Sequence, residues 1–101
     1  MKKKRNKIHL RRGQWTFGSN VPKQFDNHII RSIPGYLEGH ELIKKISEFF
    51  LTEKSVCYDV GSSTGTLLKK LSDYNRKNIK LIGIEIEKKM ISQAKKNLKS
   101  Y

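Results

Sequence analysis

The sequence has little of several features that mark common classes of protein. It contains one cysteine, Cys57, so no internal disulfide can form, and no Cys/His spacing suits a metal ion. It has no run of about 18 apolar residues, which a membrane-spanning helix needs. The basic start, Met1 to Arg5, is not followed by the apolar stretch that would complete a signal peptide. We therefore expect a cytoplasmic protein that does not enter a membrane.

Acidic residues are also scarce, and their distribution is uneven. Nine Asp and Glu stand against 22 Lys and Arg, which gives a net charge of +13. Residues 1–24 hold eight basic residues and no acid, whereas residues 25–53 hold five acids and three bases. Such a basic balance favours nucleic acid or another polyanion as a partner, although it does not determine the fold.

The pattern of apolar residues divides the chain into two parts. Residues 1–24 show no apolar periodicity and predict an irregular basic arm, and residues 25–101 predict an α/β domain. Helical spacing is present at about 25–36, 37–51, 67–75 and 90–98, with strands expected at 55–60 and 79–86. The alternation of helix and strand indicates βαβ construction with parallel strands. The nearly continuous apolar second strand is typical of a sheet with both faces covered.

The segment from Asp59 to Gly65, Asp-Val-Gly-Ser-Ser-Thr-Gly, stands where the first strand passes into the next helix. Glycines such as Gly61 and Gly65 are needed where the backbone turns sharply and a ligand approaches it closely. Glu85 follows 26 residues after Asp59, at the end of the second strand. An acid in this place accepts hydrogen bonds from ribose hydroxyls in nucleotide-type sites. The two features together predict such a site.

Other nucleotide motifs fit this loop less well. A dinucleotide fingerprint needs glycine where Ser63 stands, and a phosphate-binding P-loop needs lysine where Thr66 stands. A ligand without a pyrophosphate, such as S-adenosylmethionine, tolerates the looser loop. The purely structural alternative is that the glycines form a tight turn and that Glu85 is a solvated acid.

Two segments carry a resemblance to a known superfamily. Residues 56–65 resemble motif I of the class I S-adenosylmethionine-dependent methyltransferases, and residues 81–98 resemble their second-strand segment. This implies a Rossmann-like fold. Residues 31–36, Arg-Ser-Ile-Pro-Gly-Tyr, and 58–63, Tyr-Asp-Val-Gly-Ser-Ser, look more specifically like the carboxy-S-adenosylmethionine synthases. Those enzymes transfer a carboxyl group from prephenate onto S-adenosylmethionine, and their product feeds wobble-uridine modification in tRNA.

The resemblance implies S-adenosylmethionine, or its carboxylated form, as the cofactor. Gly61, Ser62 and Ser63 would line its methionine end, and Tyr36 would reach over its charged end. Glu85 would hold the ribose and Ile86 would lie beside the adenine. No general base is identifiable. The implied cofactor-binding residues are Tyr36, Asp59, Gly61, Ser62, Ser63, Gly65, Glu85 and Ile86.

The superfamily's sheet has seven strands, and this sequence supplies two clear ones. We therefore expect a fold truncated after the second strand and its helix, which a partner chain or a dimer would complete. Whether such a chain is an active transferase stays open. The alternative is a small basic RNA-binding or accessory protein with an inactive scaffold, which contacts tRNA or other nucleic acid through its basic arm.

Overall fold

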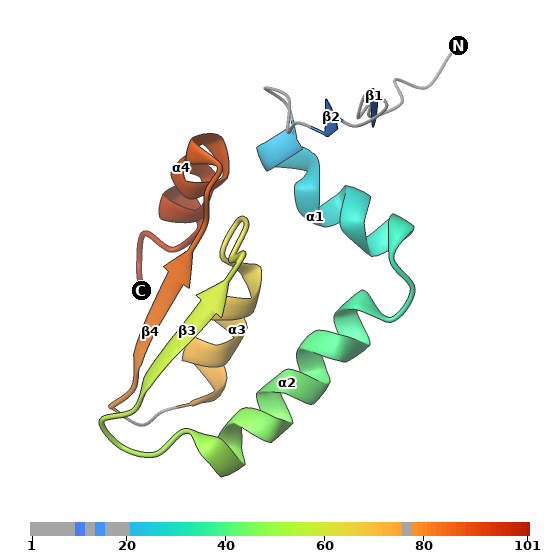
Figure 1. Cartoon of the computed structure of the whole chain (residues 1–101). Coiled ribbons are helices and arrows are strands. Elements are labelled where there is room, and N and C mark those ends of the chain that lie inside the picture. Colours follow the sequence, from blue (N-terminus) through green and yellow to red (C-terminus); the bar gives the residue numbers. More distant parts are fainter. Residues whose placement is uncertain (1–9, 12–13, 16–20, 76–77) are drawn as a thin grey trace.

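The computed structural model describes residues 10–11, 14–15, 21–75 and 78–101 (Figure 1). The elements in chain order are β1 (Leu10–Arg11), β2 (Gln14–Trp15), α1 (Val21–Ser32), α2 (Tyr36–Phe50), β3 (Val56–Val60), α3 (Thr66–Tyr74), β4 (Lys80–Ile84) and α4 (Lys88–Asn97). The predicted order of helices and strands in the domain is confirmed.

The predicted basic arm is less irregular than expected where it is described. β1 and β2 form a short antiparallel pair, in which Leu10 lies opposite Trp15. Helix α1 begins at Val21, inside the range assigned to the arm. Pro22 stands in its first turn, where the missing N–H costs no intrahelical hydrogen bond. The rest of the arm lies outside the described residues.

Helices α1 and α2 are separated by the Pro34-Gly35 turn that the sequence marks. α1 ends at Ser32, earlier than the apolar pattern suggests, because a residue preceding proline is disfavoured in the helical conformation. Gly35 then adopts a left-handed φ of 77°, and α2 starts at the next residue, Tyr36.

β3 and β4 are parallel neighbours, with Val56 opposite Lys80 and Val60 opposite Ile84. Helix α3 connects them, so the pair with its crossover is the expected βαβ unit. β4 ends at Ile84, two residues before the predicted end. Glu85 and Ile86 therefore follow the strand, and the chain turns there towards α4.

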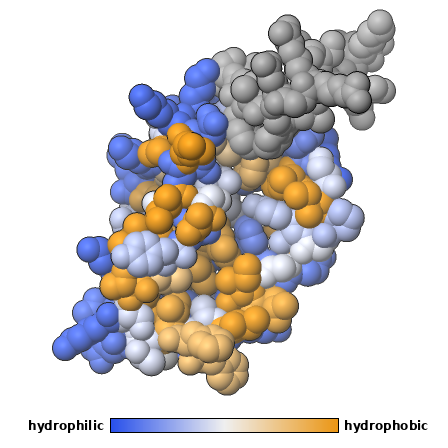
Figure 2. Space-filling model, in the orientation of Figure 1, coloured by the Kyte–Doolittle hydropathy of each residue, from blue (hydrophilic) through white to orange (hydrophobic). Residues whose placement is uncertain are grey.

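One face of this sheet is covered and the other is open. Gly83 in β4 lies so close to α3 that a Cβ on it would stand 2.7 Å from Cδ1 of Leu68. Leu68 and Leu71 of α3 and Met90 of α4 are buried. On the opposite face Tyr58 is 60% exposed and Val60 is 79% exposed. α3 lies behind the two strands in Figure 1, and apolar residues gather over the sheet region in Figure 2. The expectation that both faces are covered is wrong within the described chain.

Candidate functional site

The loop after β3 owes its shape to an unusual backbone. Gly61, Ser63 and Gly65 have positive φ values of 75°, 54° and 81°. Such angles are ordinary for glycine, whereas they carry strain for Ser63. Strain of this kind concentrates at functional sites. The loop is fixed to the end of β4, because Gly61 N–H and Ser62 N–H both donate to the Ile84 carbonyl, at 2.7 and 3.1 Å.

Glu85 joins this loop to the start of α4. Its Oε1 accepts a hydrogen bond from the backbone N–H of Ser63, and its Oε2 accepts one from the backbone N–H of Glu87, both at 2.9 Å. An ionised carboxylate offers about four acceptor positions, so two remain for further donors. Glu85 is half-buried at the carboxyl end of the strand, which is where open α/β sheets bind ligands.

A cavity of about 170 Å³ lies beside the loop, between it and the helices α1 and α2. Its lining includes five of the residues that the sequence assigned to a cofactor: Tyr36, Asp59, Gly61, Ser62 and Ser63. The apolar side of the lining comes from Phe25, Ile29, Ile33 and Leu67. Residues from four different elements and a loop are thus brought to one hollow.

The other three assigned residues lie elsewhere. Glu85 lines a neighbouring hollow of about 530 Å³ between β4 and α4, which Ser62 also lines. Ile86 is 90% exposed. Gly65 is buried, and a Cβ there would stand 2.7 Å from Cδ1 of Leu98, so its local role is close packing of the loop on α4.

Negative charge is concentrated around the smaller cavity. Burial, and then the nearby Glu85 carboxylate, raise the pKa of Asp59 above its ordinary value. Burial raises the pKa of Tyr36 as well, with further contributions from Asp26 and Asp59. Asp59 is the acid in the lining of this cavity, and Asp26 lies beside it through its hydrogen bond from Thr64. The cavity therefore favours a cationic group on a ligand and disfavours a phosphate.

Asp26 is a site residue for which the sequence gave no motif. From α1, its Oδ1 accepts a hydrogen bond from Thr64 Oγ1 at 3.1 Å, and its Oδ2 accepts one from Thr66 Oγ1 at 2.8 Å. These bonds hold α1 against the loop and the start of α3. The one available signal is a single acid between the apolar positions Phe25 and Ile29.

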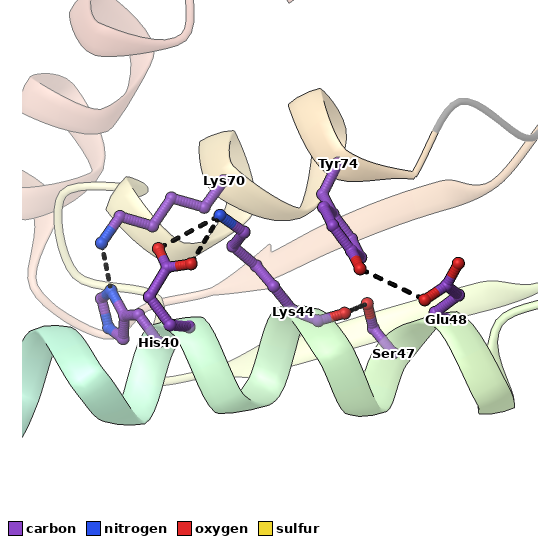
Figure 3. Close-up of polar contacts among 7 residues, drawn as sticks. His40, Lys44, Ser47, Glu48, Lys70 and Tyr74 are labelled. Carbon is purple, nitrogen blue, oxygen red and sulfur yellow. Dashed lines mark hydrogen bonds and ion pairs between the residues drawn. The ribbon is translucent and has the colours of Figure 1, made fainter.

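The sequence shows no partner spacing around His40 and so predicts a surface or capping histidine, but in the structure His40 is buried beside Tyr36. The two ring centroids are 4.3 Å apart, and Lys70 Nζ lies 3.2 Å from His40 Nδ1 (Figure 3). Burial, and then the charge of Lys70, lower the pKa of His40, while Asp26 and Glu41 act in the opposite direction. Neutral His40 can thus accept a hydrogen bond from Lys70, and its ring packs against that of Tyr36.

Other chemistries find no support in the described residues. No group of three or more His, Cys, Asp or Glu there is arranged to hold a metal ion. No helix among them is long and apolar enough to cross a membrane. Cys57 is half-buried on β3, and burial followed by the charge of Asp59 raises the pKa of its thiol.

Comparisons with known proteins agree with this geometry. The chain is 44% identical over 73 residues to the carboxy-S-adenosyl-L-methionine synthase of Staphylococcus epidermidis, which is 71% of this chain and 32% of that protein. It is 36% identical over 88 residues to the synthase of Nautilia profundicola, covering 87% of this chain and 37% of that protein. A solved S-adenosylmethionine-dependent methyltransferase from Aquifex aeolicus superposes with a TM-score of 0.57 at 27% identity, covering 84% of this chain and 42% of that one.

The chain is related to the class I S-adenosylmethionine-dependent methyltransferases. Its fold is the Rossmann-like α/β fold of that superfamily, as the sequence predicted. No family model matches the chain. The chain spans about one third of the length of the curated synthases that it matches. It is thus methyltransferase-like over the first strands and helices of the fold, including the glycine-containing loop.

Proposed function

We propose that this chain binds S-adenosylmethionine through the cavity beside the Asp59–Gly65 loop. The observation that supports this most directly is the acidic cavity itself, with Tyr36, Asp59 and Ser63 in its lining. The methionine end of S-adenosylmethionine carries a sulfonium, an ammonium and a carboxylate, so its net charge is positive and an acid in the lining favours it. NAD and ATP would bring phosphates to the same place.

The site residues would contact different parts of the cofactor. Gly61, Ser62 and Ser63 would surround the methionine end with backbone and hydroxyl groups. Asp59 would attract its positive charge, and Tyr36 would close the hollow from α2. Glu85, with two acceptor positions still free, would take the ribose hydroxyls, and the exposed Ile86 would cover the adenine. Gly65 would act indirectly, through packing of the loop.

The reaction class that follows is group transfer at the sulfonium centre. The relatives include both a methyltransferase and carboxy-S-adenosyl-L-methionine synthases, so the transferred group would be methyl or carboxyl. The sulfonium supplies the activation. The described residues contribute position and electrostatics, which is the usual share of a protein in cofactor chemistry.

The open face of the sheet bears on how the cofactor half-site is completed. Val56, Tyr58 and Val60 are exposed along β3, and β3 has one strand neighbour among the described residues. The matched segment is 32% of the length of one relative and 37% of the other. We infer that further α/β polypeptide, corresponding to the rest of those relatives, covers this face and pairs with β3. A dimer of this chain is the alternative occupant.

Nucleic acid, tRNA included, is a second candidate partner. The supporting observation is the charge distribution, with eight basic residues and no acid in residues 1–24. Deletion of residues 2–12 should weaken RNA binding and reduce its salt dependence.

Calorimetric titration of the full chain with S-adenosylmethionine tests the cofactor proposal. We expect saturable binding in the wild type, and a loss of at least about tenfold in affinity in Glu85→Ala, because the ribose loses a charge-assisted acceptor. Glu87→Ala is the matched control, since it removes the same charge two residues away and leaves its backbone N–H in place. Circular dichroism verifies that each variant is folded.

Three outcomes would contradict the proposal. A folded wild type that ignores S-adenosylmethionine would shift the function to the basic binding module. Equal losses in Glu85→Ala and Glu87→Ala would remove Glu85 from the site. Displacement of S-adenosylmethionine by equimolar NAD or ATP would indicate a different adenine nucleotide as the ligand.

A further inference from the structure

The outer side of α4 carries a set of lysines with no acid among them. From residue 88 to residue 101 the sequence contains five lysines and neither Asp nor Glu. All five side chains are exposed, and they are Lys88, Lys89, Lys95, Lys96 and Lys99. Hydrophilic residues fringe the side of the molecule where α4 lies in Figure 2.

Helical geometry places the four lysines of α4 on one side of the helix, and Lys99 follows in the turn after Asn97. Lys88 and Lys95 are seven residues apart, as are Lys89 and Lys96, so each pair recurs after about two turns at 3.6 residues per turn. At about 1.5 Å per residue, the neighbours Lys88 and Lys89 lie roughly 10 Å along the helix axis from the neighbours Lys95 and Lys96. Met90 and Ala94 lie on the opposite side of the same helix.

The apolar side of α4 is already used by the fold. Met90 is 1% exposed and packs with Phe25 of α1, while Ala94 and Leu98 close over Gly65. A helix that lies in a membrane surface needs its apolar face free to enter the lipid. The exposed side of α4 is therefore charged and has no free apolar face. This favours a polyanion in water over a membrane surface as its partner.

We propose that the lysine stripe of α4, defined as Lys88, Lys89, Lys95, Lys96 and Lys99, binds the phosphate backbone of a nucleic acid. Two lysine pairs roughly 10 Å apart can contact phosphates at two places along one nucleic acid strand. Lysine contacts to phosphate position a protein without reading its sequence, so the binding is not sequence-specific. This inference rests on nucleic acid as the second candidate partner, and of the five lysines Lys95 also lines the hollow beside Glu85.

The test compares two variants of the full chain with equal charge loss. The first changes Lys88, Lys89, Lys95 and Lys96 to glutamine. The control changes four exposed lysines on other parts of the chain to glutamine, namely Lys23, Lys45, Lys54 and Lys80. Fluorescence anisotropy with a labelled single-stranded 12-nucleotide RNA gives the affinity at four salt concentrations, and circular dichroism verifies folding. Paired variants, K88Q/K89Q and K95Q/K96Q, replace the first variant if it does not fold.

The expected result is a difference in slope between the two variants. Each lost phosphate contact reduces the slope of log affinity against log salt by about 0.7 for a single strand, so four contacts give a reduction of about 3. Affinity at low salt should fall at least about tenfold in the α4 variant and much less in the control.

The proposal fails under several distinct results. Equal losses in the two variants would mean that net charge alone acts. Loss of all binding on deletion of residues 2–12, with no effect of the α4 substitutions, would assign binding to the arm instead. Binding to anionic phospholipid vesicles but not to RNA would make the stripe a membrane contact. S-adenosylmethionine titration of K88Q/K89Q, whose residues do not line the hollow beside Glu85, separates these results from a failure of the cofactor proposal.

Discussion

The backbone N–H of Ser63 donates to Oε1 of Glu85 across 2.9 Å, and this bond joins the loop after β3 to the residue that follows β4. The same carboxylate takes the N–H of Glu87 on its other oxygen. The acid that the motif assigned to a ligand is thus also part of the scaffold. A substitution of Glu85 should therefore change both the stability of the fold and the proposed ligand binding.

Substitution of Glu85 by glutamine should therefore weaken the fold as well as the site. The amide keeps one acceptor oxygen and turns a donor towards the second N–H, so one backbone group loses its partner. We expect the free energy of unfolding to fall by about 1–2 kcal/mol, measured by urea unfolding at pH 7. Glu53→Gln, at an exposed position, should change it by less than about 0.5 kcal/mol, as surface substitutions do. Equal stability of Glu85→Gln and wild type would show that these two hydrogen bonds contribute nothing.

Gly83→Ala should be destabilising for a steric reason. The new Cβ would stand 2.7 Å from both Leu68 Cδ1 and Ser62 Oγ, so the loop or α3 must move. Overpacking of this kind costs about 1–3 kcal/mol, and thermal unfolding would report it. Gly39→Ala is the control, because a Cβ there meets nothing within 4 Å and alanine stabilises a helix by about 0.5–1 kcal/mol over glycine. The interpretation of β4 packing would be wrong if both variants gained stability.

Asp59→Asn should separate stability from ligand binding. The pKa of Asp59 is raised by burial and by Glu85, so its ionised form is disfavoured in the folded chain relative to the unfolded one. The neutral amide should raise stability at pH 7, and should weaken binding of the cationic ligand. Urea unfolding and calorimetry on the same sample measure the two effects. A variant that is both more stable and equally tight in binding would exclude Asp59 as an electrostatic contact.

The buried His40 should make stability depend on pH in a defined direction. Its folded pKa lies below the ordinary value of 6.5, so in the window below 6.5 the unfolded chain binds a proton that the folded chain does not. The contribution of His40 to stability is therefore present above pH 6.5 and is lost as pH falls through the folded pKa. Denaturation between pH 5 and pH 8 should show this slope, and His40→Gln should flatten it. Asp26 and Glu41, which oppose the shift, are unchanged in that variant, and an unaltered slope would assign the pH dependence to other groups.

The sequence predicted those features that depend on local pattern. The strands, the helices around them, and the glycine loop with Glu85 after the second strand are all present, because periodicity and turn chemistry are written in neighbouring residues. Asp26 was missed because its partner Thr64 is 38 residues away and an acid in a helix has no motif of its own. His40 was misplaced for a similar reason, since its burial depends on Lys70 from another helix. The cofactor assignments of all eight site residues remain predictions.

The open edge of β3 favours self-association of the chain, which its positive charge opposes. An unpaired strand beside exposed apolar residues is a template for pairing with another strand, including one from a second copy. Copies that each carry a charge of +13 repel one another in dilute buffer. Salt shortens the range of that repulsion to about 8 Å at physiological strength and leaves the strand edge unchanged. Self-association of the isolated chain should therefore increase with salt, whereas the proposed binding to RNA should weaken.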